Sequence, residues 1–170
     1  CYATSSNPDS GFEYGGVLIS NADIFEGDDV RDKASNYYGN NHGGILELNG
    51  EFYIFYHRHT NRTSYSRQAC AEKIFMTSDG RFNQVEMTSC GLNDGPLNGL
   101  GSYEARIACS LWSKNGAGRY DVRGSKRLFS KHPYFCQDGK DSSADAVQYI
   151  ANIRDGATAG FKFFKFVSVK

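Results

Sequence analysis

An Asn-Gly pair at residues 49–50 is the sequence feature that most constrains how this chain folds. Both central residues of a tight type I′ turn need a positive φ, which Asn and Gly tolerate well, so the pair predicts a β-hairpin. A short apolar segment at residues 45–48 precedes the pair, and an aromatic segment at residues 51–58 follows it. The sequence therefore predicts two antiparallel strands that meet at this turn.

The second predicted strand is apolar on both faces. Its alternate residues form two sets, each rich in large apolar side chains: Phe52, Ile54 and Tyr56, and Tyr53, Phe55 and His57. This pattern is typical of a strand that is covered on both sides. Further strands are predicted at residues 65–76 and 82–88, around a turn at residues 78–80. The four strands form a predicted meander that must lie between similar sheets, as the blades of a β-propeller do.

The segments around this meander differ from it in composition. Residues 1–20 predict two strands, and residues 21–36 are a polar connection to the meander. Glycines crowd residues 90–101, which we interpret as a linker. The linker divides the chain into a first part that ends with the meander and a second part that follows it.

The second part predicts an incomplete β-sandwich. Strands are predicted at residues 103–112, 148–153 and 161–169, whereas residues 120–129 are ambiguous. A complete sandwich usually needs about seven strands. Unfinished sheets expose edges that natural domains avoid. We therefore expect a preceding segment or another chain to complete the sheets of both parts.

Composition excludes several classes of function. The chain has 170 residues, with 19 basic and 19 acidic side chains and no net charge, so a nucleic-acid partner is not expected. It contains no apolar run of membrane-spanning length. Its five cysteines are widely spaced and form no CxxC pair, which disfavours a zinc site. The cellular compartment stays open.

Four groups of segments, in order along the chain, resemble glycoside hydrolase family 43. They are CYATS with GFEYGGVLISN; NNHGG with YIFYHR and SRQAC; EMTSCGLNDGPLNG; and YIANIRDGATAGFKFF. The resemblance is to bacterial β-xylosidases and α-L-arabinofuranosidases with an appended sandwich. It implies that residues 1–90 hold the end of blade four and blade five of a five-bladed propeller. Residues 91–101 would be the linker, and residues 102–170 the beginning of a family 6-like carbohydrate-binding sandwich.

The resemblance also implies a chemistry. Family members are inverting hydrolases, in which a carboxylate base activates water and a carboxylic acid protonates the leaving oxygen, roughly 6.5–9.5 Å apart. In the family these carboxylates lie upstream of a segment like CYATS. We therefore assign no catalytic carboxylate to this chain and expect it to be inactive alone. Glu47, Glu51 and Glu72 are expected at strand ends or on solvent faces.

Three residues carry over from the family as candidate binding residues. The resemblance places His42 in the axial channel of the propeller, linked through water to a calcium ion, although calcium prefers oxygen ligands. The alternative is that His42 hydrogen-bonds the backbone of its own turn. Arg67 is favoured over Arg58 as the arginine that binds sugar, because a guanidinium donates forked hydrogen bonds to neighbouring hydroxyls. The alternative is that either arginine pairs with a carboxylate such as Glu72.

Three functions remain open at this point. The first is part of a glycosidase that acts on xylose- or arabinose-containing plant polysaccharides or oligosaccharides. The second is a non-catalytic carbohydrate-binding β protein. The third is a structural β module that assembles by edge pairing.

Overall fold

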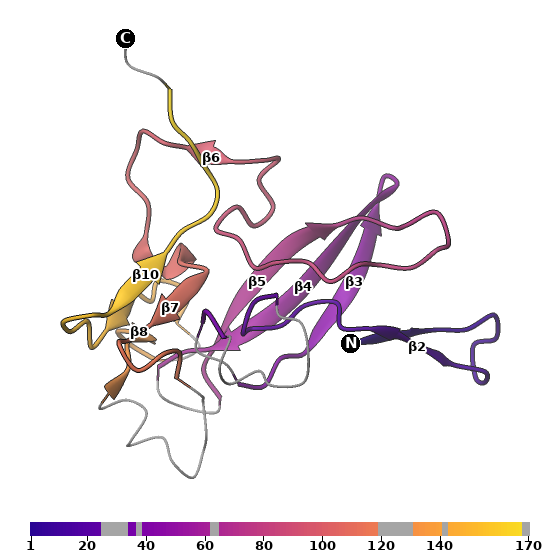
Figure 1. The fold of residues 1–170 in the computed structure, drawn as a ribbon, viewed down its shortest axis with the longest axis horizontal. Coiled ribbons are helices and arrows are strands. Elements are labelled where there is room, and N and C mark those ends of the chain that lie inside the picture. The colour runs from indigo at the N-terminus through magenta and orange to yellow at the C-terminus, as the bar shows by residue number, and fades with distance from the viewer. Residues whose placement is uncertain (25–33, 37–38, 62–64, 119–130, 141–142, 168–170) are drawn as a thin grey trace.

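The computed structural model describes residues 1–24, 34–36, 39–61, 65–118, 131–140 and 143–167. The elements described are eleven strands and one 3₁₀ turn, η1 (Ala105–Ile107), which confirms the predicted class of secondary structure (Figure 1). The predicted propeller and sandwich stay predictions, since no sheet of the described residues closes on itself. The described part holds no helix with the length and apolar character of a membrane span.

The centre of the first part is a three-stranded antiparallel sheet. Its order is β3 (Gly43–Leu48), β4 (Glu51–His59) and β5 (Arg67–Ile74). Asn49 and Gly50 both have positive φ, at 54° and 81°, which confirms the predicted hairpin turn between the first two strands. A second turn lies where the sequence predicts it, with the Gly80 amide donating to the carbonyl of Thr77 at 3.0 Å.

The predicted fourth strand at residues 82–88 is wrong. This segment forms no ladder with β5 in the described structure. The Val85 amide instead donates to the carbonyl of Leu18 at 2.9 Å, and the Thr88 amide donates to the Glu72 carboxylate at 2.7 Å. Because long-range partners take its hydrogen bonds, the segment packs against the sheet as an irregular strip rather than extending it.

The sheet buries one face and leaves the other open. Ile54, Tyr56 and Ile74 lie on the covered face, where they pack with residues from outside the sheet: Leu18, Met87 and Cys109. The opposite face, which we call the open face, carries Leu46, Leu48, Tyr53 and Phe55. Leu46 is 46% exposed and Phe55 is 39% exposed. Coverage on both faces, as the apolar pattern of residues 51–58 predicts, is therefore not achieved within the described residues.

A short hairpin precedes the central sheet. It consists of β1 (Tyr2–Thr4) and β2 (Glu13–Gly16), so the two strands predicted in residues 1–20 are present but short. The Tyr2 hydroxyl accepts from the Phe82 amide at 2.8 Å, which ties the hairpin to the strip beside the sheet. The polar connection predicted at residues 21–36 lies largely outside the described residues.

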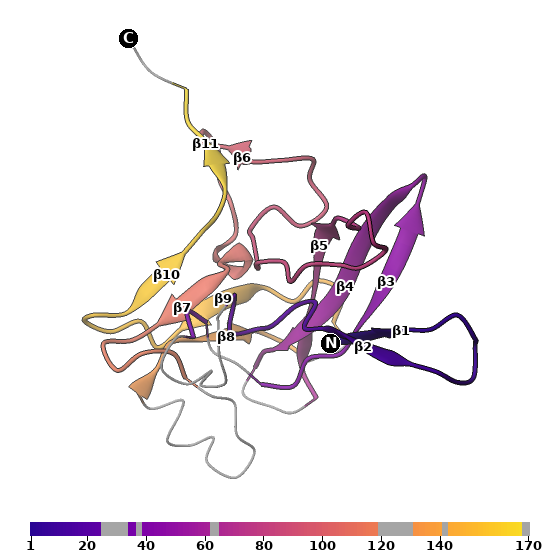
Figure 2. The same cartoon turned by 45° about the vertical axis from the view of Figure 1, so that its right-hand side comes forward.

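The second part consists of three two-stranded ladders. β7 (Ser110–Trp112) pairs with β10 (Thr158–Gly160), and β8 (Tyr134–Gln137) pairs with β9 (Gln148–Ala151). A parallel pair of β6 (Leu97–Asn98) and β11 (Phe164–Lys165) lies apart from the central sheet (Figures 1 and 2). A small core holds the β7–β10 and β8–β9 ladders together: Ala108, Leu111 and Phe135.

The predicted strands of the second part are shorter in the structure than in the sequence analysis. Residues 103–112 begin with η1 and become extended only at β7, and residues 161–169 hold only the two-residue β11. The ambiguous segment 120–129 lies outside the described residues. The predicted linker is not isolated, because the Leu97 amide donates to the Phe163 carbonyl at 2.9 Å.

The two parts contact each other through polar groups that are partly or fully buried. The Lys162 ammonium lies 2.8 Å from carboxylate oxygens of both Asp23 and Glu86. The buried Asn36 amide donates to the Cys109 carbonyl at 3.0 Å. The domain boundaries at residues 90 and 101 stay a prediction, but the described structure joins the two parts through a shared interface.

Candidate functional site

Four polar residues gather at one end of the central sheet, which we call the histidine end: His42, His57, His59 and Arg67. His42 lies just before β3, and its backbone amide donates to His57 Nε2 at 3.2 Å. His42 Nδ1 lies 3.1 Å from the same nitrogen, and the ring centroids are 5.3 Å apart. The His57 and His59 rings meet edge to face at 6.0 Å. Residues 15 positions apart along the chain are thus brought into direct contact.

The turn that carries His42 is fixed by two local features. The buried Asn21 side chain donates to the His57 carbonyl at 3.2 Å and accepts from the Asn41 side chain at 3.1 Å. Gly43 passes so close to β4 that a Cβ there would lie 2.5 Å from the Phe55 carbonyl oxygen. Only glycine permits this approach, so the Asn-Asn-His-Gly sequence is matched to the strand beside it.

The electrostatics of the histidine end keep His57 neutral. Burial lowers the pKa of His57 to about 4, and the charges of Arg67, His42 and His59 lower it further. Burial likewise lowers the pKa of His59. A neutral His57 ring can accept the His42 amide proton at Nε2, which is the hydrogen bond that the structure contains.

The described residues do not by themselves make a calcium site around His42. None of their His, Cys, Asp and Glu side chains form a group of three or more that could hold a metal ion. Calcium takes about six to eight oxygen ligands, and a single exposed histidine supplies none. The calcium ion expected at His42 therefore stays a prediction, for which waters or residues elsewhere would have to supply the oxygens.

The two candidate arginines lie on opposite faces of the sheet. Arg67 is exposed at the start of β5, in register with His59 and therefore at the histidine end. Arg58 is only 4% exposed and points to the covered face, where Nε donates to Gln68 Oε1 at 2.8 Å. Its terminal nitrogens donate to the carbonyls of Ala108, at 2.6 Å, and Arg106.

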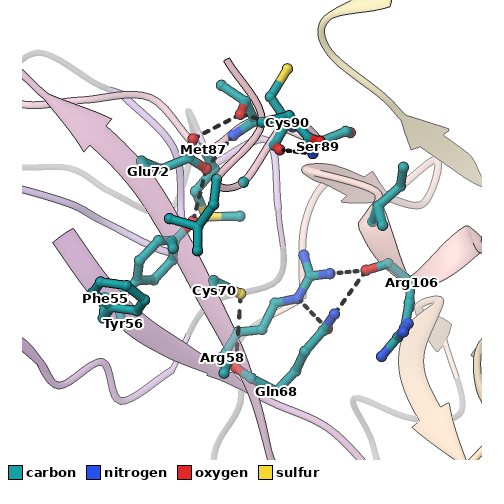
Figure 3. A pocket seen from close by; sticks show the side chains of 17 residues that line it. Phe55, Tyr56, Arg58, Gln68, Cys70, Glu72, Met87, Ser89, Cys90 and Arg106 are labelled. Carbon is teal, nitrogen blue, oxygen red and sulfur yellow. Dashed lines mark hydrogen bonds between the residues drawn. The ribbon is translucent and has the colours of Figure 1, made fainter. Parts of the chain in front are cut away.

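The contacts of Arg58 are internal to the protein. Its guanidinium carbon lies 3.6 Å from the centre of the Phe135 ring, a cation–π contact that adds to its three hydrogen-bonded partners. Figure 3 shows the side chain pointing toward Arg106 of the second part. Arg58 therefore joins the two parts. Of the two candidate arginines, Arg67 is the one whose side chain is exposed. Sugar binding by either residue stays a prediction.

A cavity of about 440 Å³ lies along the free edge of β5 (Figure 3). Five consecutive strand residues, 68–72, form one wall, and residues 87–93 with Arg106 and Ile107 form the other. Among the described lining residues the only acid is Glu72, which is 5% exposed. The expectation that Glu72 faces solvent is therefore wrong, whereas Glu47 and Glu51 are exposed as expected.

Glu72 is held by three hydrogen bonds. Its carboxylate accepts from the Thr88 amide and the Thr88 hydroxyl, each at 2.7 Å, and from the Tyr56 hydroxyl at 3.3 Å. Burial raises the pKa of Glu72 to about 7, and the hydrogen bonds from Thr88 and Tyr56 oppose this rise. Because its oxygens are engaged with the protein, Glu72 anchors the irregular strip at residues 82–88 to β5.

The sequence held a signal for the burial of Glu72. Strand residues two apart share a face, so Gln68, Cys70 and Glu72 line up with Ile74, which is buried. The contact between His42 and His57 had no comparable signal, since it depends on the hairpin register and on Asn21. Cys70 is a free thiol, like the other four cysteines.

The chain is thus all-β, with an open sheet face, the histidine end of the central sheet and a cavity beside β5. The chain is 51% identical, over its full length, to 171 residues of a protein from Thermoclostridium stercorarium named "Xylosidase/arabinosidase". It spans 36% of that relative's length, so roughly a third of the relative is represented here. No protein-family model matches the chain, and no solved structure matches it.

Proposed function

We propose that this chain forms part of a family 43 glycoside hydrolase that releases xylose or arabinose from plant polysaccharides or oligosaccharides by an inverting mechanism. The observation that carries the proposal is the 51% identity with the xylosidase/arabinosidase of Thermoclostridium stercorarium. In this proposal the acid and base carboxylates belong to other blades. The chain contributes the fifth blade and the beginning of a sugar-binding sandwich.

The open face of the central sheet supports this assignment. Leu46, Leu48, Tyr53 and Phe55 form an apolar surface on a sheet whose other face is already buried. Radially packed blades bury both faces of each sheet. In the proposed enzyme, the preceding blades cover this apolar surface, either from a longer form of the same chain or from another chain.

The histidine end supplies the polar groups in this proposal. Arg67 is exposed and can donate forked hydrogen bonds to vicinal sugar hydroxyls. His57 contacts both the backbone amide and the ring of His42. In this proposal His42 would face the axial channel, where a hydrated calcium ion would supply positive charge beneath the sugar. These residues bind and orient the substrate, and they transfer no proton to or from the glycosidic oxygen.

A chimeric enzyme tests the proposal. The 171 matching residues of the Thermoclostridium stercorarium protein are replaced by this chain, and hydrolysis of 4-nitrophenyl β-xyloside and 4-nitrophenyl α-arabinofuranoside is measured. We expect the chimera to hydrolyse at least one substrate and the 170-residue chain alone to hydrolyse neither. A folded chimera without activity, beside an active parent enzyme, would contradict the proposal.

Two arginine variants sharpen the test. In the chimera, Arg67→Gln should lower kcat/KM by about tenfold or more, since it removes a charged hydrogen bond to the sugar. Arg81→Gln is the matched control, because Arg81 is also exposed but lies at a turn beside Asp79. Equal effects of the two changes would remove Arg67 from the sugar site.

The second candidate function is sugar binding without chemistry. It is favoured by exposed aromatic rings beside β11, where Tyr103 meets Phe164 edge to face at 5.1 Å and Phe166 is 74% exposed. Aromatic rings of this kind can stack on sugar faces. Tight binding of xylan or arabinan by the chain alone, together with an inactive chimera, would select this function.

A further inference from the structure

Three loops of the second part meet around a small cavity that the proposed glycosidase chemistry does not use. The cavity has a volume of about 290 Å³ and is lined by residues from the turn after β7, the segment before β8 and the loop between β9 and β10. Its charged lining residues are Lys114, Lys131, Arg154 and Asp155. Three cations and one anion thus face the same space in a chain whose overall charge is zero.

The three cations have no carboxylate partner among the described residues. The ion pairs of the described structure involve other cations: Lys73, Arg81, Arg106 and Lys162. Asp155 also lines the cavity, but it makes no ion pair with Lys114, Lys131 or Arg154. Their convergence on one cavity leaves a local excess of positive charge, which favours an anionic ligand.

The loops that carry these cations are held in place by specific contacts. Arg154 Nε donates to Asn152 Oδ1 at 2.8 Å, and the Asn152 side chain donates to the His132 carbonyl at 2.9 Å. Asn152 has a positive φ of 59°, a conformation that Asn tolerates better than most residues. Because Asn152 engages only Nε of Arg154, the two terminal nitrogens remain for a forked contact with a carboxylate.

A second contact fixes the position of Lys114. Gly156 has a φ of 75°, and a Cβ built on it would lie 3.0 Å from the Lys114 Cβ. The loop after β7 therefore packs directly on the loop between β9 and β10. Ser113 strengthens this corner, since its hydroxyl accepts from the Asn115 amide at 3.1 Å and lies 3.0 Å from His132 Nδ1.

We propose that this cavity binds a single uronic acid residue, a sugar ring that carries a carboxylate. This inference rests on the proposed function, since the uronic acid would be a side group of the pentose polysaccharide that the enzyme attacks. A volume of 290 Å³ is at the small end of ligand pockets, which begin at roughly 300 Å³, so it suits one ring rather than an oligosaccharide.

The mixture of groups favours a uronate over a phosphate. The guanidinium of Arg154 can pair with the carboxylate of a uronate, and the Asp155 carboxylate, which repels anions, can accept from a hydroxyl of the sugar ring. The side chain of Asn115, which also lines the cavity, can hydrogen-bond a ring hydroxyl. Recognition would therefore combine charge at one end of the ring with hydroxyl contacts at the other.

Isothermal titration calorimetry on the 170-residue chain tests the proposal with four probes: xylotriose carrying a glucuronic acid branch, unbranched xylotriose, glucuronate alone and inorganic phosphate. We expect the branched sugar to bind at least about tenfold more tightly than unbranched xylotriose, a difference of about 1.4 kcal/mol. Equal affinity for the two trisaccharides, no binding of the branched sugar, or tighter binding of phosphate would overturn the proposal. Glucuronate alone should bind measurably, but more weakly than the branched sugar.

Three variants locate the site. Arg154→Gln and Lys131→Gln should each weaken binding of the branched sugar by about tenfold, since each removes a charged contact. Lys165→Gln, which makes the same change of charge at an exposed position of β11, should leave it unchanged. Unchanged binding in both cavity variants, with circular dichroism showing that they are folded, would overturn the assignment. The binding assay needs no turnover. The cavity proposal can therefore fail while the chimera hydrolyses its substrate, and the proposed function can fail while the cavity binds the branched sugar.

Discussion

The buried carboxyl of Glu72 gives the sharpest test of the described structure, through the change Glu72→Gln. Burial raises the pKa of Glu72 from 4.5 to about 7. Since one pKa unit corresponds to about 1.36 kcal/mol, the shift amounts to roughly 3 kcal/mol of folding free energy. Glutamine keeps an oxygen that can accept from the Thr88 amide but carries no titrating group.

The sign of the change in unfolding free energy with pH depends on whether the folded or the unfolded chain binds the Glu72 proton more tightly. The folded chain binds a proton on Glu72 more tightly than the unfolded chain does. Stability from this group is therefore fully present below about pH 4.5 and is lost as the pH rises through about 7. Between pH 4.5 and pH 8, the unfolding free energy of the Gln variant should rise relative to the natural chain by about 3 kcal/mol.

Urea unfolding at pH 4.5, 6, 7 and 8 provides the measurement, with the difference between the two proteins taken at each pH. Taking the difference removes the contribution of the other titrating groups. Glu47→Gln is the control, because Glu47 is exposed on β3, and its difference should stay constant with pH. A Glu72→Gln difference that varies by less than about 0.5 kcal/mol across this range would refute the reasoning.

Three further predictions follow from the geometry of the first part. Arg58→Met should destabilise the chain by about 3 kcal/mol in urea unfolding, because it leaves the buried Ala108 carbonyl without its donor and the Arg106 carbonyl with Gln68 alone, whereas Arg67→Met should change stability by less than about 0.5 kcal/mol. Gly43→Ala should cost about 1–3 kcal/mol, since its Cβ would lie 2.5 Å from a β4 carbonyl, whereas Gly44→Ala meets open space and should be tolerated. The His57 ring should titrate in NMR spectra near pH 4 rather than 6.5, so its contribution to stability is present above about pH 6.5 and lost as the pH falls through about 4. Similar costs for either pair of variants, or a His57 midpoint near 6.5, would contradict the corresponding contacts.

Local chemistry made part of the fold predictable from the sequence. The turn at Asn49 and Gly50 depends on the φ preferences of two adjacent residues, so its prediction is confirmed. Residues 82–88 have an alternating pattern that suits a strand, but their hydrogen bonds go to Leu18 and Glu72. No local pattern reports which distant group will capture a backbone amide.

The candidate site shows the same division. His42 and Arg67 were identified by resemblance and lie at one end of the sheet, which the registers of β4 with β3 and with β5 explain. Arg58 was a competing choice because it carries the same guanidinium group as Arg67 and is close in sequence to this end of the sheet. Its burial depends on carbonyls of residues 106 and 108, some 50 positions away, which a single sequence does not reveal.

The central claim is that the open face of the sheet is covered by the rest of a glycosidase, and Leu46→Glu tests it most directly. Leu46 is 46% exposed in this chain, so the variant should change the stability of the 170-residue chain by less than about 0.5 kcal/mol. In the chimera the same change would bury an unpaired carboxylate, and we expect a loss of about 3 kcal/mol of stability together with activity. An equal and small effect in both proteins would contradict the claim that other blades cover this face.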